Sequence, residues 1–196
     1  MNIGFVIGNG GSLADMPLDF LNRYPSIGSN HIFLLDGFTP TYYTAVDGRD
    51  LMTDYEARLD RMHCIKFIGT RVWQKHKPRN VIRFETGGQK FAANFLRDKV
   101  CEGWSVTFVN LQLAYYLKWD IVLLVGVDHW SRGRVDHFTP NYYDKEYEIP
   151  PLKDDLTLPY FEQAKRRFEY EDRKIINITP GTALHVFEKE DWQSWQ

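Results

Sequence analysis

The sequence predicts an α/β fold of the Rossmann-like class, with a mainly parallel sheet, helices on both faces and a single domain over residues 1–196. Short apolar runs alternate along the chain with segments of helical periodicity, which is typical of a parallel sheet built from crossover units. The run at residues 121–127 (IVLLVGV) is continuously apolar, as expected for a strand covered on both faces. A glycine-rich turn directly after the first apolar run is the third indication, since such turns join a strand to a helix in nucleotide-binding domains.

The first apolar run, residues 3–7, ends at a turn with three glycines among five residues: Gly8, Asn9, Gly10, Gly11 and Ser12. Glycine gives the backbone access to positive φ and lets a ligand approach closely, and Ser12 is a good N-cap for a helix over residues 13–21. Amide N–H groups at a helix start favour an anion. We therefore expect a nucleotide phosphate on this turn; the alternative is a tight turn that binds nothing.

The rest of the N-terminal half alternates in the same way. Strands are expected at residues 25–30, 41–46, 64–68 and 81–85. Helical segments are expected at residues 31–35 and 50–61, where Asp50 is the capping candidate. Residues 72–79 are interpreted as basic and irregular.

The C-terminal half contains the strongest helix and strand signals. The expected elements are a helix at residues 105–118 that is buried on much of its surface, the strand at 121–127, a basic amphipathic helix at 159–173 and a last strand at 174–178. Pro159 is expected near the first turn of its helix. The polar, aromatic stretch at residues 129–158 is interpreted as a loop or lid inserted into the domain.

Composition narrows the function classes. The formal net charge is −2, which argues against a nucleic-acid partner. No apolar run approaches the ~18 residues of a membrane span, and the N-terminus lacks a signal-peptide pattern. Cys64 and Cys101 lie far apart and fit no metal spacing, so buried thiols in a reducing compartment are expected. We expect a soluble cytoplasmic protein; the sequence leaves open whether it forms a homo-oligomer.

Candidate nucleotide-binding residues follow the predicted strands, because ligands bind at the carboxyl ends of the strands in an open α/β sheet. Besides the glycine turn, they are Asn30, Asp47, Ser105 and Asp128. An Asn side chain both donates and accepts, which suits ribose hydroxyls or a base edge. The alternatives are turn formation for Asn and Asp, and simple helix capping for Ser105.

Candidate catalytic residues gather in and around the predicted loop. They are His129, His137, Tyr142 and Arg134. The two histidines belong to Asp-His pairs with Asp128 and Asp136, and a carboxylate beside an imidazole can set a general base near neutral pH. Arg134 and Tyr142, with Arg132 and Tyr143 beside them, can neutralise a phosphate leaving group without a metal. A locally bonded histidine and a metal site with N and O ligands are the alternatives.

These segments resemble a known family. The turn at residues 8–13 (GNGGSL) resembles the G-N-G-P-S-L opening of the Campylobacter-type sialyltransferases and of the related 6-hydroxymethylpterin pyrophosphokinase-like family. Residues 105–128 look like their second signature, a Ser/Thr-led helix followed by an apolar strand and Gly-[IV]-Asp. His137-Phe138 with Tyr142 looks like their H-F-x-x-x-Y loop, and residues 176–181 are similar to an N-x-T/S-P-G end. The chain departs from the pattern at Gly11, where the family has Pro, and at Asp47, where the sialyltransferases have Asn.

The resemblance implies a Rossmann-like nucleotide-binding domain and a transferase. In the sialyltransferases the donor is CMP-sialic acid, a loop His is the general base and Tyr hydroxyls help the phosphate leave without a metal. We therefore expect a CMP-sugar-like donor, a glycan or small-molecule hydroxyl acceptor, no required cofactor, and a role in surface glycan synthesis. One alternative is an ATP-dependent pyrophosphokinase-like enzyme with Mg²⁺ on Asp47, Asp128 and Asp136. Another is a nucleotide-binding module without chemistry.

Overall fold

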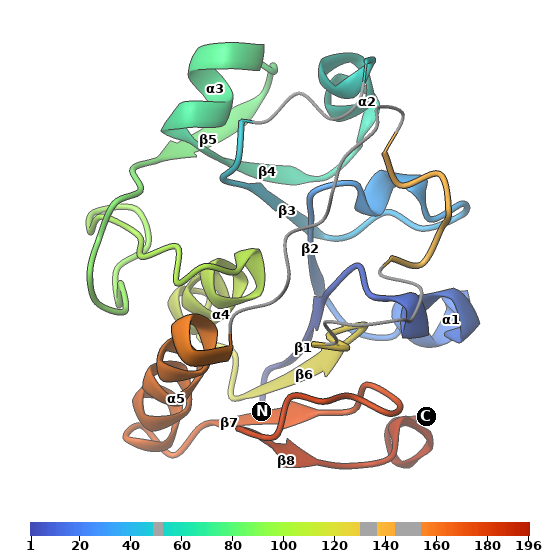
Figure 1. Ribbon diagram of the computed structural model, residues 1–196, viewed down its shortest axis with the longest axis vertical. Helices are drawn as coiled ribbons and strands as arrows, with labels where there is room; N and C mark the ends of the chain where they lie inside the picture. The colour runs from blue at the N-terminus through green and yellow to red at the C-terminus, as the bar shows by residue number, and fades with distance from the viewer. Residues whose placement is uncertain (49–52, 130–136, 144–153) are drawn as a thin grey trace.

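The computed structural model describes residues 1–48, 53–129, 137–143 and 154–196, and these build one eight-stranded sheet in which every pairing is parallel (Figure 1). The strands are β1 (Ile3–Ile7), β2 (Ser26–Ser29), β3 (Tyr42–Ala45), β4 (Ile65–Gly69), β5 (Val81–Phe84), β6 (Ile121–Val125), β7 (Lys174–Asn177) and β8 (Glu188–Lys189). The predicted Rossmann-like α/β fold is confirmed.

The strand order is β5-β4-β3-β2-β1-β6-β7-β8. The chain thus builds the sheet outward from β1 in one direction as far as β5, and then returns to the other side of β1 to lay down β6. The point between β1 and β6 is the topological switch point, where the loops above two neighbouring strands lead away in opposite directions. This fold therefore directs attention to the loops after β1 and β6.

Helices cover both faces of the sheet (Figure 1). The helices are η1 (Gly11–Asp15), α1 (Leu18–Leu21), η2 (Ile32–Leu34), α2 (Tyr55–Arg61), α3 (Thr70–His76), α4 (Val106–Tyr116), α5 (Asp154–Glu169) and η3 (Trp192–Trp195), where η marks a 3-10 helix. Side chains alternate across each strand. In β1, Val6 joins the core under α4 and α5, whereas Phe5 and Ile7 join the core on the opposite face. Because the sheet lies between these two cores, both faces of its central strands are buried, and these strands are apolar throughout.

The predicted helix at residues 105–118 is confirmed as α4, which is apolar around nearly its whole circumference. Ser105 caps it, because its hydroxyl oxygen accepts a hydrogen bond from the Thr107 N–H at 3.2 Å. The helix packs across β1, β2 and β3 and lies beside α5 (Figure 1). Within this apolar helix Asn110 and Gln112 are also fully buried.

Three helical predictions need correction. Ser12 does not cap a helix over residues 13–21: η1 begins at Gly11 after a Gly10 cap, and Pro17 separates it from α1. Residues 72–79 are not irregular, since α3 covers most of them and ends at Lys77 in the left-handed conformation. The late helix α5 begins at Asp154 and contains Pro159 in its interior, so the predicted loop insertion ends before Asp154.

The helix expected at residues 50–61 is shorter than predicted. It begins at Tyr55 with Asp54 in the N-cap position, while Asp50 lies outside the described residues. Arg58 donates to the Asp54 carboxylate at 2.7 Å, and this bond holds the pKa of Asp54 below its usual value. The sequence alone places the start of this helix poorly because Asp50 and Asp54 are both acceptable N-cap residues.

The C-terminal residues add an eighth strand, β8, which was not predicted from the sequence. After the turn at Pro180, Leu184 and Phe187 enter the core under α4 and α5, and the two-residue strand β8 pairs with β7. The final turn, η3, lies beside α1, where the Trp192 ring approaches that of Phe20 at 5.1 Å (Figure 1). None of the described helices is long and apolar enough to cross a membrane.

Both cysteines are free thiols, as expected. Cys101 is buried and Cys64 is half-buried. Burial raises the pKa of Cys64 to about 11, although the nearby Lys66 ammonium acts in the opposite direction. Lys66 is itself buried, and its ammonium donates to the carbonyls of Leu59 and Met62 at the end of α2.

Candidate functional site

The loops after β1 and β6 are fastened to each other. The Gly8 N–H donates to Val125 O at 2.7 Å, and the Gly10 N–H donates to Gly126 O at 2.9 Å. A Cβ on Gly8 would collide with the Gly126 carbonyl, and one on Gly10 would lie 2.5 Å from the Asp128 carboxyl carbon. These two glycines therefore allow two loops to pack closely, and this contact accounts for them without a ligand.

The left-handed residues at this edge are not the glycines of the turn. Gly8, Gly10 and Gly11 are absent from the positive-φ residues of the described chain, whereas Asn30, Gly126 and His129 have φ values of 52°, 65° and 56°. The predicted use of the turn glycines for positive φ is therefore wrong. Asn30 is suited to its position because Asn tolerates the left-handed region better than most side chains.

Asp128 binds the start of η1 from the neighbouring loop. Its Oδ2 accepts from the Ser12 N–H at 2.9 Å, and its Oδ1 accepts from the Ser12 hydroxyl. The backbone carbonyl of Asp128 accepts from the Ala183 N–H at 2.9 Å. The donors of Ser12 that the sequence assigns to a phosphate thus already hold a carboxylate of the protein.

Asn9 connects the ends of β1 and β2. Its amide nitrogen donates to Ser29 O at 3.0 Å, and the side chain is buried. Its Oδ1 and the Ser29 hydroxyl oxygen are both buried and have no hydrogen-bond partner within the described part of the chain. Such groups are rare in folded proteins because each loses its hydration without compensation.

A third unpaired group comes from α4. Asn110 accepts a hydrogen bond from the Thr44 hydroxyl through Oδ1, but its buried Nδ2 has no partner among the described residues. Thr44 is the register partner of Ser29 in the sheet, and paired residues of parallel strands project to the same face. Ser29, Thr44 and Asn110 therefore line the same side of the sheet, beneath the first half of α4.

His137 lies over the end of β1 in a defined tautomer. Its Nδ1 is 3.2 Å from Asn9 O, and a carbonyl can only accept, so Nδ1 carries the proton. In the neutral ring Nε2 then bears the lone pair, and it faces the Tyr143 hydroxyl at 3.2 Å. The Phe138 N–H also donates to Asn9 O, at 3.2 Å, so one carbonyl orients both the ring and the chain.

Tyr142 positions this ring from the opposite side. It stacks on His137 with centroids 3.7 Å apart and planes 17° apart, and its carbonyl accepts from His31 Nδ1 at 2.7 Å. The Tyr142 hydroxyl is buried, accepts from the His31 N–H and bonds the Asn30 side chain; burial raises its pKa well above the usual value. These contacts make Tyr142 a packing and positioning group, and Tyr143 provides the half-buried hydroxyl.

The two candidate histidines are not neighbours. His129 approaches the Phe161 ring of α5 at 5.8 Å, on the face covered by α4 and α5. His137 packs with Tyr142, which belongs to the core on the other face. A shared site that uses both rings is therefore not supported.

The other candidate residues from the sequence are not brought together at one place by the described part of the structure. Asp47 is exposed after β3, and its charge adds to the burial that raises the pKa of Tyr55 to about 12. Ser105 has the capping role described above. Arg132, Arg134 and Asp136 lie outside the described residues. Within the described ranges no three His, Cys, Asp or Glu side chains come together as a metal site would need, and the proposed magnesium set includes Asp136.

Comparison of the chain with protein-family models, curated proteins and solved structures finds no match.

Sequence reasoning missed three contributors to this site. His31, Thr44 and Asn110 all contact predicted site residues or line the same polar region. Asn110 could have been identified from the sequence, because a polar residue inside an otherwise apolar helix needs a buried hydrogen-bond partner. His31 and Thr44 carry no comparable signal, since their roles depend on strand register and on a segment more than a hundred residues away.

Proposed function

We propose that the protein is a transferase that binds a CMP-sugar-like donor at the carboxyl edge of β1, β2 and β6 and delivers the sugar to a hydroxyl acceptor. The observation that carries the proposal is the fixed tautomer of His137, in which Asn9 O holds Nδ1–H and leaves Nε2 as a proton acceptor. A positioned neutral imidazole is the usual general base for activating a hydroxyl at neutral pH.

His137 would remove the acceptor proton. As the acceptor oxygen forms its bond to the anomeric carbon, its proton passes to Nε2, and the bond from that carbon to the phosphate oxygen breaks. The electron pair leaves with the nucleotide. Tyr143 already occupies the proton-accepting side of the ring at 3.2 Å, so an acceptor hydroxyl would replace or extend that contact.

The uncharged groups nearby suit the nucleoside. Asn9 Oδ1, Ser29 Oγ and Asn110 Nδ2 offer one acceptor, one hydroxyl and one donor that have no partner in the part of the chain that the structure describes. Ribose hydroxyls and a pyrimidine edge need this mixture of donors and acceptors. The phosphate must find its donors away from Ser12, because the Asp128 carboxylate holds both donors of Ser12 and would repel an anion. Tyr143 and Arg134 are the candidates for that role.

A glycan or small-molecule acceptor and a cytoplasmic location, where activated nucleotide sugars would be available, complete the proposal. The test is turnover of CMP-sugars and UDP-sugars by the full chain, followed by release of the free nucleotide. We expect His137→Gln to lower kcat by about 10²-fold or more while the melting temperature changes little. Tyr170→Phe, in an exposed ring far along the chain, is the control.

Two outcomes would overturn the proposal. One is full turnover by His137→Gln. The other is a chain that ignores nucleotide sugars and transfers diphosphate from ATP with Mg²⁺, which would favour the pyrophosphokinase-like alternative.

A further inference from the structure

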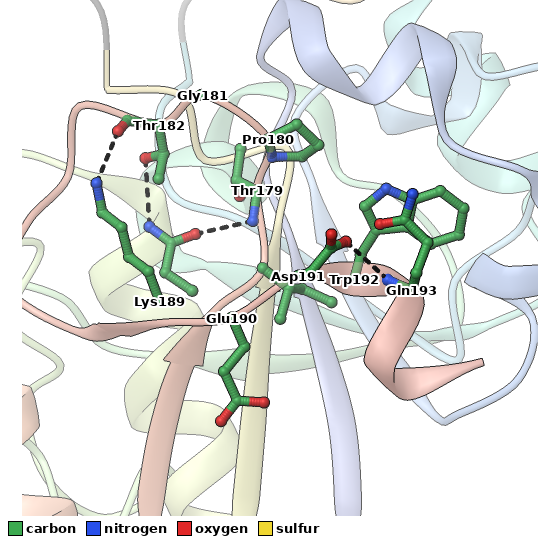
Figure 2. Close-up of a pocket in the computed structure, with 11 residues that line it drawn as sticks. Thr179, Pro180, Gly181, Thr182, Lys189, Glu190, Asp191, Trp192 and Gln193 are labelled. Carbon is green, nitrogen blue, oxygen red and sulfur yellow. Dashed lines mark hydrogen bonds between the residues drawn. The ribbon is translucent and has the colours of Figure 1, made fainter.

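A cavity lies at the same edge of the sheet, beyond the switch point and beside β7 and β8. It has a volume of about 500 Å³ and lies between the loop after β7 and the segment that follows β8 (Figure 2). Its lining includes Thr179, Thr182, Lys189, Asp191, Trp192 and Gln193. Cavities of roughly 300–1,000 Å³ are typical of small-molecule sites.

Three charged residues, Lys189, Glu190 and Asp191, line this cavity, and strand geometry directs the Glu190 side chain away from the other two. Side chains alternate along extended chain, so Lys189 and Asp191 share one side and Glu190 takes the other. Figure 2 shows Glu190 pointing away from the other labelled side chains. The Glu190 carboxylate instead accepts from the Trp195 indole N–H at 2.9 Å.

Lys189 and Asp191 are both exposed, and both side chains make local hydrogen bonds but retain bonding capacity. The Lys189 ammonium is 3.0 Å from Thr182 O and 2.9 Å from His185 Nδ1, which occupy two of its three N–H donors. Asp191 Oδ1 accepts from the Gln193 N–H at 3.0 Å, and the Gln193 side-chain amide nitrogen lies against both carboxylate oxygens, which leaves only part of the accepting capacity of Asp191 for a ligand. An ammonium donor and a carboxylate acceptor thus both line the cavity, at separate places in it (Figure 2).

This combination selects the class of ligand. An anion that bonds Lys189 would be repelled by Asp191, and a cation that bonds Asp191 would be repelled by Lys189, so a singly charged ligand gains little net attraction here. A hydroxyl group both donates and accepts, so a neutral ligand with several hydroxyls satisfies both side chains. The half-buried Trp192 ring adds an apolar platform, which is the surface that the C–H faces of a sugar ring can cover.

We propose that this cavity binds a neutral saccharide through Lys189, Asp191 and Trp192. The site is separate from the nucleotide region but connected to it, because the Thr182 hydroxyl donates to Val127 O at 2.8 Å and Ala183 bonds the backbone of Asp128. Saccharide binding at this place requires neither a nucleotide nor turnover, so it stands whether or not the protein is a transferase.

The test is an NMR titration of the full ¹⁵N-labelled chain. Methyl α-glucopyranoside, methyl β-galactopyranoside and methyl α-mannopyranoside are each added to about 100 mM, a range suited to millimolar dissociation constants. The chain has 6 Trp, and Trp192→Phe identifies the indole signal of Trp192. At least one saccharide is expected to shift that signal and the amides of residues 189–193 with saturation, while the signal of the exposed Trp104 stays in place.

Charge-matched variants complete the test. Asp191→Asn is expected to weaken saccharide binding about fivefold or more, whereas Glu56→Gln, which removes one exposed carboxylate on α2, leaves it unchanged. The proposal is overturned if none of the three saccharides gives a saturable shift, if Asp191→Asn binds as tightly as the unaltered chain, or if inorganic phosphate or spermidine produces the same shifts instead. None of these readouts depends on His137 or on a nucleotide.

Discussion

Asn110 and Gln112 lie two residues apart on α4, and both have buried amide side chains, yet they differ in how fully their hydrogen-bonding groups are satisfied. Gln112 uses both ends of its side chain: Oε1 accepts from the N–H groups of Ala92 and Cys101, and Nε2 donates to the carbonyls of Cys101 and Phe108. Asn110 bonds Thr44 through Oδ1, and its Nδ2 lacks a partner in the described chain. The difference separates a structural polar group from one with capacity left for a ligand.

The same contrast distinguishes two parts of the molecule. Around Gln112 the loop at residues 91–101 is fastened to α4 through satisfied hydrogen bonds. At the carboxyl edge, Asn9 and Ser29 add two more buried atoms without a partner among the described residues, and the Asn9 carbonyl also orients the ring of His137. Proteins keep such groups where a water or a ligand completes them.

The largest expected effect is at Gln112. Gln112→Leu leaves the Ala92 and Cys101 N–H groups and the Cys101 carbonyl buried without their partner, and should lower the free energy of unfolding by about 3 kcal/mol. The matched Asn110→Leu leaves only the Thr44 hydroxyl and should cost about 1 kcal/mol or less. Urea denaturation measures both. Equal losses in the free energy of unfolding for the two variants would show that Gln112 and Asn110 do not differ as proposed.

On the other face of the sheet, the hydrogen-bonded hydroxyls of Tyr43 and Tyr55 should make the stability of the protein depend on alkaline pH. Tyr43 and Tyr55 lie 2.8 Å apart through their hydroxyl oxygens; burial raises the pKa of Tyr55 to about 12 and that of Tyr43 well above its usual value. A raised folded-state pKa favours the neutral form, so its stabilisation is complete below pH 10 and is lost as the pH rises toward 12. The free energy of unfolding should fall by about 2–3 kcal/mol over that interval.

Tyr55→Phe is the control for the alkaline measurement. It removes one titrating hydroxyl and should make the decline between pH 10 and 12 shallower. A decline of the same slope in this variant would mean that other groups cause it.

A smaller loss of stability than for Gln112→Leu is expected when the hydrogen bonds between the loops after β1 and β6 are removed. Asp128→Ala removes the acceptors of the Ser12 N–H and hydroxyl, in a half-buried position where water can partly replace them. We expect a loss of about 1–2 kcal/mol in the free energy of unfolding. If a phosphate belongs on the Ser12 donors, this variant should bind nucleotide more tightly, which would restore the prediction made from the sequence.

Much of the scaffold follows from local pattern, and much of the site does not. The strand β6 and the helix α4 are plain from their apolar residues, because both are covered on most sides. The strand β8 has two exposed residues and no pattern to detect. His137 is a candidate from chemistry alone, but its tautomer depends on a carbonyl 128 positions away. Ser12 is predicted to cap a helix, but in the structure it donates hydrogen bonds to Asp128, which lies 116 positions later in the chain.

The central claim is that the unpaired atoms of Asn9, Ser29 and Asn110 belong to a nucleotide site. The most direct test is the shift in melting temperature caused by CMP, UDP-sugars and ATP, each with and without Mg²⁺. At about 100 times its dissociation constant, CMP should raise the melting temperature of the unaltered chain by about 5–10 °C without Mg²⁺, and by far less in Asn9→Ala and Asn110→Leu. No shift with any nucleotide, or an equal shift in both variants, would contradict the account.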